Sequence, residues 1–196
     1  IQNSKLQIQK IIDILNAELG YSLKFKKDFR IEFYDISNTG GSEAVGSMVV
    51  SVGGDFARGD YRKFKIKTVK GPNDVLMLRE VLGRRVRKIS NFQFPISNQY
   101  PISNDKKDSS FSKKPDIIIL DGGKPQLGEI HGLFKSLNIQ IPLISLAKKE
   151  EIVFGIRAGD FRQTSIKKNS DIGFFIQNIR DEAHRFAITY HKKLRS

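Results

Sequence analysis

The chain has 196 residues, and its 34 Lys and Arg outnumber its 21 Asp and Glu, for a formal net charge of +13. That length suits one domain with a sizeable core and at most a small appendage. The absence of cysteine excludes disulfides and thiolate metal sites, fits a reducing compartment, and leaves carboxylates and three histidines as metal ligands. The positive charge favours a polyanionic partner such as nucleic acid, although a protein can also be basic without one.

The amino-terminal stretch predicts a helix, because isoleucines and leucines recur at helical spacing from Ile8 to Leu19 and Gly20 follows. It lacks the pattern of a signal peptide, and no run in the chain has the length of a membrane span. Since the first residue is Ile1, we expect a piece of a longer protein. We expect residues 1–29 to be a helical lead-in that packs on the domain or links it to a missing one.

Residues 30–37 have the two-residue period of a strand, on which Ile31, Phe33 and Asp35 share one face. An aspartate on a core face is anomalous, because burying a carboxylate without a partner is costly. We therefore expect Asp35 to be paired, bound to a metal ion, or placed at the open end of its strand.

Two more strand-like runs, 47–52 and 61–69, are separated by turn residues and predict an antiparallel hairpin that completes a three-stranded meander. The second run alternates lysines with apolar residues, so one face is basic, as it would also be on a solvated edge strand. A helix capped by Asn73 or Asp74 follows. Its apolar stripe runs from Leu78 to Val86, and its arginines either lie along a phosphate backbone or form a solvated face.

Residues 91–114 differ from their surroundings, because they are rich in Ser, Asn, Lys and Pro and repeat Pro-Ile-Ser-Asn at 95–98 and 101–104. No period in this stretch would bury a face. We expect a flexible insertion without chemistry of its own.

The stretch from Pro115 to Gln126 predicts a buried strand that ends at a functional site. Its unbroken apolar run stops at Asp121, which Gly122 and Gly123 follow. In open α/β sheets, ligands bind at the carboxyl ends of the strands. The glycine pair lets the backbone turn sharply and approach a ligand. The alternative is that Asp121 is only a turn residue or a helix cap.

The rest of the chain predicts a helix near 127–137, a strand at 143–147 reached by a parallel crossover, and a hairpin within 150–168. A long closing helix starts at Ser170 or Asp171. This order of elements is that of the ribonuclease H architecture. We therefore expect an α/β fold in which residues 30–196 form a mixed sheet, three antiparallel strands followed by parallel ones, flanked by helices.

Eight motifs resemble, in the same order, the endonuclease domain of UvrC, the incision subunit of the UvrABC nucleotide-excision-repair system. They are Phe33 to Ser37, Ser47 to Val50, Tyr61 to Phe64, Lys67 to Val69, Arg79 to Leu82, Ile119 to Leu127, Leu146 to Lys148 and Ile179 to Ile188. The resemblance covers most of the chain from about Arg30 onward, apart from the 91–114 insertion and residues 155–168. It departs at Asn38, where the family usually has a histidine whose contact would be lost, and at Gly46, where it usually has an alanine.

The resemblance implies that Asp35, Asp121 and His184 are the catalytic residues and bind Mg²⁺ or Mn²⁺. The first and fourth strands are expected to be neighbours, which places both carboxylates at one sheet edge within reach of the last helix. Carboxylate oxygens suit these ions, and Mn²⁺ tolerates a histidine better. His184 is either a ligand or a proton-transfer group, and no motif supports a role for His131 or His191.

Further charged residues are candidates that could equally cap helices or pair with carboxylates. The candidates for phosphate contacts are Lys124, Arg185, Arg62, Arg84 and Arg85. Those for supporting a metal ion through its water shell are Glu43, Asp181 and Glu182.

By resemblance, the chain is an excision endonuclease that cuts damaged double-stranded DNA on the 5′ side of a lesion in the bacterial cytoplasm. The partners implied are UvrB, with UvrA upstream. The parts missing here would be an amino-terminal GIY-YIG nuclease and carboxyl-terminal helix-hairpin-helix motifs, so we expect weak DNA binding by this chain alone. The alternatives are a non-cutting scaffold of the same fold that binds nucleic acid or a repair partner, and a metal-independent enzyme.

Overall fold

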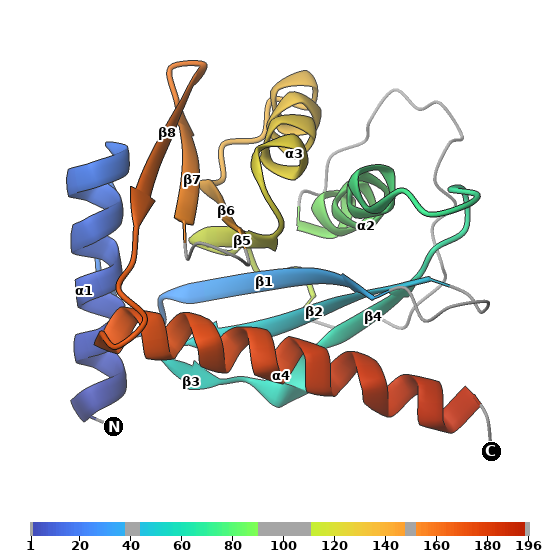
Figure 1. Ribbon diagram of the computed structural model, residues 1–196, viewed down its shortest axis with the longest axis horizontal. Helices are drawn as coiled ribbons and strands as arrows, with labels where there is room; N and C mark the ends of the chain where they lie inside the picture. The colour runs from blue at the N-terminus through green and yellow to red at the C-terminus, as the bar shows by residue number, and fades with distance from the viewer. Residues whose placement is uncertain (1, 38–43, 90–110, 148–151, 195–196) are drawn as a thin grey trace.

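One mixed sheet organises the computed structural model, which describes residues 2–37, 44–89, 111–147 and 152–194 (Figure 1). Its strands are β1 (Arg30–Ser37), β2 (Val45–Val52), β3 (Asp55–Phe56), β4 (Arg62–Lys65), β5 (Ile117–Asp121), β6 (Leu143–Ala147), β7 (Ile152–Arg157) and β8 (Asp160–Ser165). They lie in the order β3-β2-β1-β5-β6-β7-β8, and β4 also pairs with β2.

The predicted meander is present in β1, β2 and β4, which pair antiparallel. The short strand β3 and a 3₁₀ turn, η1 (Arg58–Asp60), lie between β2 and β4. The third strand is shorter than the predicted 61–69 and ends at Lys65. Beyond it the backbone N–H groups of Lys67 and Thr68 donate to the carboxylate of Glu80 instead of to a neighbouring strand, which explains the early end.

The parallel part of the sheet is also as expected. β5 lies between β1 and β6 and is parallel to both. The predicted hairpin is β7 and β8, joined through Ala158 and Gly159, whose φ angles of 52° and 93° make a tight turn. Three antiparallel strands followed by parallel ones form the expected ribonuclease H order, to which β7 and β8 add an antiparallel extension.

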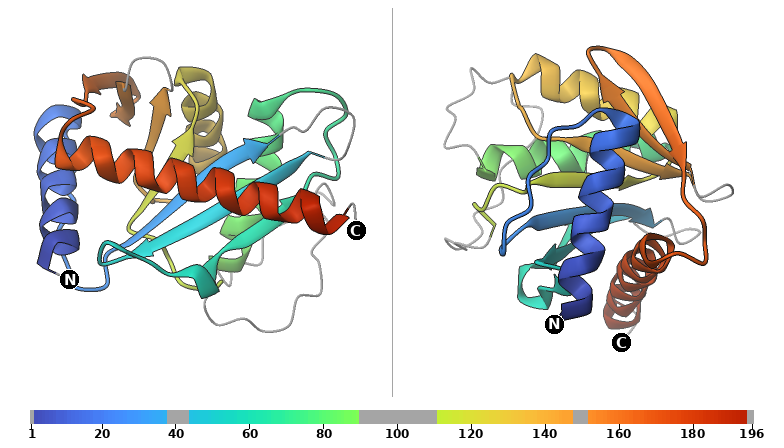
Figure 2. Two further views of the ribbon diagram at one scale, coloured as in Figure 1. Left: turned by 60° about the horizontal axis from the view of Figure 1, so that its bottom comes forward. Right: turned by 90° about the vertical axis from the view of Figure 1, so that its left-hand side faces the viewer.

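Helices cover both faces of the sheet (Figures 1 and 2). On one face lie α2 (Asp74–Ile89), which contacts β1 and β2, and α3 (Lys124–Ser136), which contacts β6 and β7. On the other lies α4 (Asp171–Leu194), which runs across β1 and β2 and also contacts α1 (Gln2–Leu19). No helix in the described ranges is long and apolar enough to cross a membrane.

Local sequence accounts for the starts of α2 and α4. The Asn73 carboxamide accepts a hydrogen bond from Leu76 N–H (3.0 Å) at the start of α2, and the Ser170 hydroxyl accepts one from Gly173 N–H (3.1 Å) at the start of α4. The predicted stripe of α1 is buried against α4, β7 and β8, so this helix packs on the domain.

The 91–114 insertion lies mostly outside the described residues. Only its last four residues are described, and there the Phe111 ring packs against Phe64 with a centroid distance of 6.0 Å.

Candidate active site

The register of β1 and β5 brings two aspartates together. Phe33 pairs with Ile119 and Tyr34 with Leu120, so the next residues, Asp35 and Asp121, follow in the same register. Neighbouring strands lie about 4.8 Å apart, and residues in parallel register point to the same face. The two carboxylates therefore project side by side just beyond the last β1–β5 pair, at the end of β5 and two residues before the end of β1. Asp35 is 8% exposed and accepts a hydrogen bond from the Ser37 hydroxyl (2.9 Å).

Both aspartates face α4. Ile119, two residues before Asp121, lines a small apolar cavity together with residues of α1 and α4. From α4, Arg180 places its Nε 3.4 Å from the Asp121 carboxylate, and both side chains are largely buried. A guanidinium thus neutralises part of the charge that two adjacent carboxylates concentrate at this edge.

His184 lies one helical turn beyond Arg180, on the same flank of α4. Its side chain is exposed. Among the described residues, no three His, Asp or Glu side chains are close enough together to hold a metal ion. The structure thus brings Asp35 and Asp121 together and places His184 on the helix that faces them, without gathering all three.

The loop after β5 needs its glycines. Gly122 has a φ of 156°, and a Cβ there would lie 2.7 Å from the Gln126 side chain. That side chain accepts a hydrogen bond from Gly123 N–H (3.0 Å) at the start of α3. Lys124 follows with an exposed side chain, whose Nζ lies 5.3 Å from the centre of the Phe154 ring. It is near Asp121 in sequence, but its described contact is with β7.

Glu182 and Arg185 lie on the other flank of α4. Arg185 donates two hydrogen bonds to the Glu182 carboxylate, both 2.7 Å, and Tyr61 O–H donates a third (3.0 Å). The Arg185 bonds, followed by that from Tyr61, outweigh burial and lower the pKa of Glu182 to about 2. Burial, followed by the same carboxylate, raises the pKa of Tyr61. Glu182 is thus engaged away from Asp35 and Asp121, contrary to a role in the water shell of a metal ion there.

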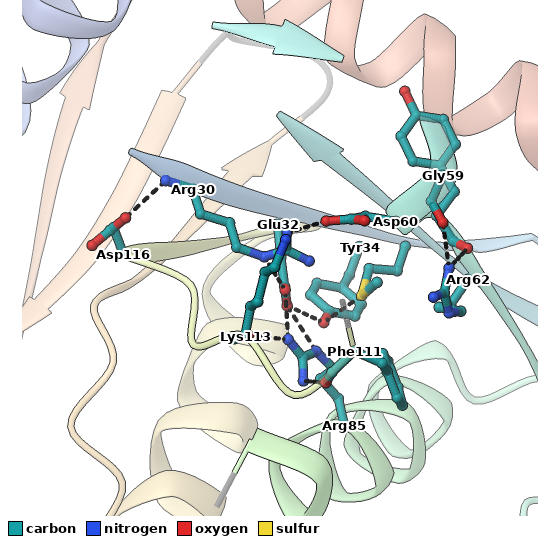
Figure 3. Close-up of polar contacts among 12 residues, drawn as sticks. Arg30, Glu32, Tyr34, Gly59, Asp60, Arg62, Arg85, Phe111, Lys113 and Asp116 are labelled. Carbon is teal, nitrogen blue, oxygen red and sulfur yellow. Dashed lines mark hydrogen bonds and ion pairs between the residues drawn. The ribbon is translucent and has the colours of Figure 1, made fainter. Parts of the chain in front are cut away.

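The prediction that Arg85 contacts a DNA phosphate is wrong. Arg85 is fully buried under α2 and donates to both oxygens of Glu32, at 2.7 and 3.0 Å, and to the carbonyls of Phe111 and Lys113 (Figure 3). A guanidinium without exposed surface does not contact DNA. Burial lowers the pKa of Arg85, but its interactions with Tyr34 and Glu32 outweigh this effect and hold that pKa above its ordinary value.

The other two arginine candidates are partly exposed. Arg62, the first residue of the edge strand β4, donates to the carbonyls of Gly59 (2.9 Å) and Tyr61 (2.6 Å). Arg84 donates to the carbonyl of Lys65 (2.8 Å) and lies 3.5 Å from Glu80. Both lie around the exposed edge of the meander.

Comparison with known proteins places these features in a family. Residues 22–188 match the family model described as the UvrC RNase H endonuclease domain. The chain belongs to this family. The UvrABC system protein C of Alkaliphilus oremlandii is 41% identical over 193 residues, and that of Methanosphaera stadtmanae is 44% identical over 169. These alignments cover 97% and 86% of this chain but only 30% and 26% of the relatives, so the chain spans under a third of the UvrC proteins it matches.

A solved structure of Ciona intestinalis endonuclease V, in complex with an inosine-containing DNA, aligns over 95% of this chain and 96% of its own. The TM-score is 0.44 and the identity 10%. At that level the likeness carries no conclusion about substrate.

The sequence interpretation missed Arg180, although its UvrC motif contains it. The signal was its spacing, because a residue four before His184 lies on the same flank of the helix. Asn38, Glu43 and Lys148, together with the side chain of His191, lie outside what the structure describes, and His131 lies in α3 away from the aspartates, beside Pro142 and Ile156.

Proposed function

We propose that this UvrC-type domain hydrolyses a DNA phosphodiester at a divalent-metal site built on Asp35 and Asp121. The observation that carries the proposal is the register of β1 and β5, which brings the two carboxylates side by side just beyond the last β1–β5 pair. The net charge of +13 fits a phosphate substrate.

The donor set fits Mg²⁺ or Mn²⁺, because carboxylate oxygens on two rigid, adjacent strands are ligands that these ions prefer. When bound, such an ion would polarise the scissile phosphate and favour deprotonation of the attacking water. His184 would complete the site as a further ligand or as the group that moves a proton, and its place on the α4 flank facing the aspartates supports either role.

Arg180 would change partner during the reaction. In the structure its guanidinium contacts Asp121. Once a cation neutralises that carboxylate, the guanidinium would be available to a phosphate oxygen, for which its planar donors are suited.

Membership in the UvrC family supports the finer proposals. They are incision on the 5′ side of a lesion in damaged double-stranded DNA, cooperation with UvrB after UvrA, and a cytoplasmic location. The relatives are more than three times as long as this chain, which is consistent with targeting by parts such as a GIY-YIG nuclease and helix-hairpin-helix motifs.

A non-cutting scaffold is the second candidate. The Arg180 contact favours it, because Asp121 has an internal cation without any metal ion. The described residues also gather no three-ligand cluster.

The two candidates are separated by nicking of supercoiled plasmid DNA with Mn²⁺ at high protein concentration. We expect nicking by the chain and a loss of more than about 100-fold in Asp121→Asn, since even residues that only support metal ligands contribute 10- to 100-fold. Asp160→Asn, in the exposed β7-β8 turn, is the matched control and should nick normally. No nicking by the chain would favour the scaffold, whereas equal nicking by both variants would contradict a metal site built on Asp121.

The side of incision is tested in the full-length protein that carries this domain, with UvrA, UvrB and an end-labelled duplex containing one lesion. Asp121→Asn should remove the 5′ cut and leave the 3′ cut. Loss of the 3′ cut alone would contradict the assignment.

A further inference from the structure

A second charged cluster lies on the flank of α4 that faces away from the aspartates. Its centre is Glu182, which is 7% exposed. One of its oxygens accepts hydrogen bonds from Arg185 Nη2 (2.7 Å), Tyr61 O–H (3.0 Å) and Arg58 Nε (3.3 Å), and the other accepts one from Arg185 Nε (2.7 Å). Two guanidinium groups from separate elements, η1 and α4, therefore converge on a single carboxylate.

This cluster has more positive charge than its internal pairing requires. The bidentate bond from Arg185, with the Tyr61 hydroxyl, already satisfies Glu182, so Arg58 is a second cation on a neutralised carboxylate. The side chains of Arg58 and Arg185 are 71% and 54% exposed. Exposed ion pairs contribute little to stability, and stability alone gives no reason to hold two like charges side by side.

A third cation lies next to the pair. The Lys63 ammonium is 4.3 Å from the centre of the Phe186 ring, and that ring packs edge-to-face against Tyr61 with a centroid distance of 5.1 Å. Even without Lys63, Arg58 and Arg185 against the one carboxylate of Glu182 leave a net charge of about +1 on a small, exposed area. The aromatic pair holds the start of β4 against α4, because Tyr61 directly precedes β4 and Phe186 belongs to α4.

The arginines keep donors that face solvent. A guanidinium has five N–H groups. Arg58 directs one of them to Glu182 and Arg185 directs two. The remaining donors of these two exposed groups suit the oxygens of a phosphate, which planar guanidinium groups bind in bidentate fashion.

We propose that Arg58 and Arg185 form a binding site for a backbone phosphate of DNA, with Glu182 and Tyr61 as the residues that position them. The inference rests on the proposed nuclease function and adds where one substrate strand is held. Arg180 and Arg185 lie five residues apart, which is about 7.5 Å along α4. For a strand that ran parallel to α4, with phosphates rising about 3.4 Å each, this phosphate would lie roughly two nucleotides from the one that is cut.

The test is DNA binding by the 196-residue chain, measured by fluorescence anisotropy with a labelled duplex in EDTA at several salt concentrations. Each lost phosphate contact makes the slope of log K against log salt shallower by about 0.9. If the affinities are equal at 1 M salt, this lowers the affinity at 0.1 M salt about eightfold. We expect that reduction in Arg58→Ala and in Arg185→Ala. Arg162→Ala, on the edge strand β8 at the other side of the sheet, should lower the slope by much less.

Glu182→Gln separates a built site from general attraction. The substitution adds one unit of positive charge, so non-specific electrostatics predicts tighter binding. If Glu182 positions the two arginines, binding should weaken instead, about as much as in the single arginine variants. Circular dichroism and thermal unfolding confirm that each variant is folded.

The site is overturned if Arg58→Ala and Arg185→Ala match Arg162→Ala in slope, or if Glu182→Gln binds more tightly than the parent chain. Because these measurements contain no divalent metal and involve no cutting, either outcome leaves the nicking test of Asp121 untouched. Failure of that test, in turn, would leave a DNA-binding site on a non-cutting domain.

Discussion

Glu32 and Asp35 lie three residues apart on β1 and are both buried, but they face opposite sides of the sheet. On the α2 side, Glu32 accepts hydrogen bonds from Arg30 (3.0 Å), from Arg85 and from Tyr34 (2.8 Å), and Arg30 in turn pairs with Asp60 (Figure 3). On the α4 side, Asp35 lies two residues before the end of its strand, next to Asp121.

The difference separates a structural carboxylate from a chemical one. Glu32 lies inside the sheet, where it is fully buried and its described partners come from the same strand and from α2. Asp35 and Asp121 lie just beyond the last β1–β5 pair, towards the carboxyl ends of their strands, where ligands bind in open α/β sheets. Burial alone does not distinguish the two kinds of site, whereas the position along the strand does.

The largest expected effect is on the free energy of unfolding and concerns the structural carboxylate, Glu32. Arg85→Ala would leave Glu32 buried without its bidentate partner and should lower the free energy of unfolding by about 3–5 kcal/mol. Urea unfolding at pH 7 measures it. Arg84→Ala, at the neighbouring but partly exposed position, should cost less than about 1 kcal/mol. Similar values for the two variants would contradict a structural role specific to Arg85.

A packing change on the same face comes next. A Cβ on Gly46 would lie 2.6 Å from Val81 Cγ2 and 3.3 Å from Ile36 Cδ1. Gly46→Ala should therefore destabilise the domain by about 1–3 kcal/mol. The double variant with Val81→Ala should show a coupling that offsets part of this cost in a double-mutant cycle. Additive effects would show that Val81 is not the obstacle.

On the chemical side, Arg180→Met removes the cation beside Asp121. Since the guanidinium and a metal ion would compete for the same carboxylate, we expect Mn²⁺ to bind up to about tenfold more tightly without DNA. Titration calorimetry measures the change. Weaker binding would mean that Arg180 instead holds the carboxylates in place for the ion.

The smallest effect concerns Glu182. Because its pKa is lowered from 4.5 to about 2, the folded state holds fewer protons than the unfolded state between these values. The resulting stabilisation is complete above about pH 5 and is lost as the pH falls towards 2. Acid unfolding of the parent chain should thus be steeper in this range than that of Glu182→Gln. Parallel curves would contradict the lowered pKa.

Much of this comparison could be predicted from the sequence, and the rest depended on distant partners. The strand ending at Asp121 was predictable because its apolar run is unbroken, and the Asp35 strand because its period is clear. Arg85 was misjudged, although it lies seven residues after Leu78, on the apolar stripe of α2. Its partner Glu32 is 53 residues away, and no local pattern joins the two.

The most direct test of the central claim is Mn²⁺ binding by titration calorimetry in the parent chain, Asp121→Asn and Asp160→Asn. If Asp35 and Asp121 form one metal site, the parent and Asp160→Asn should bind Mn²⁺ and Asp121→Asn should not. Equal heats in all three proteins, or none in the parent at millimolar Mn²⁺, would contradict the claim.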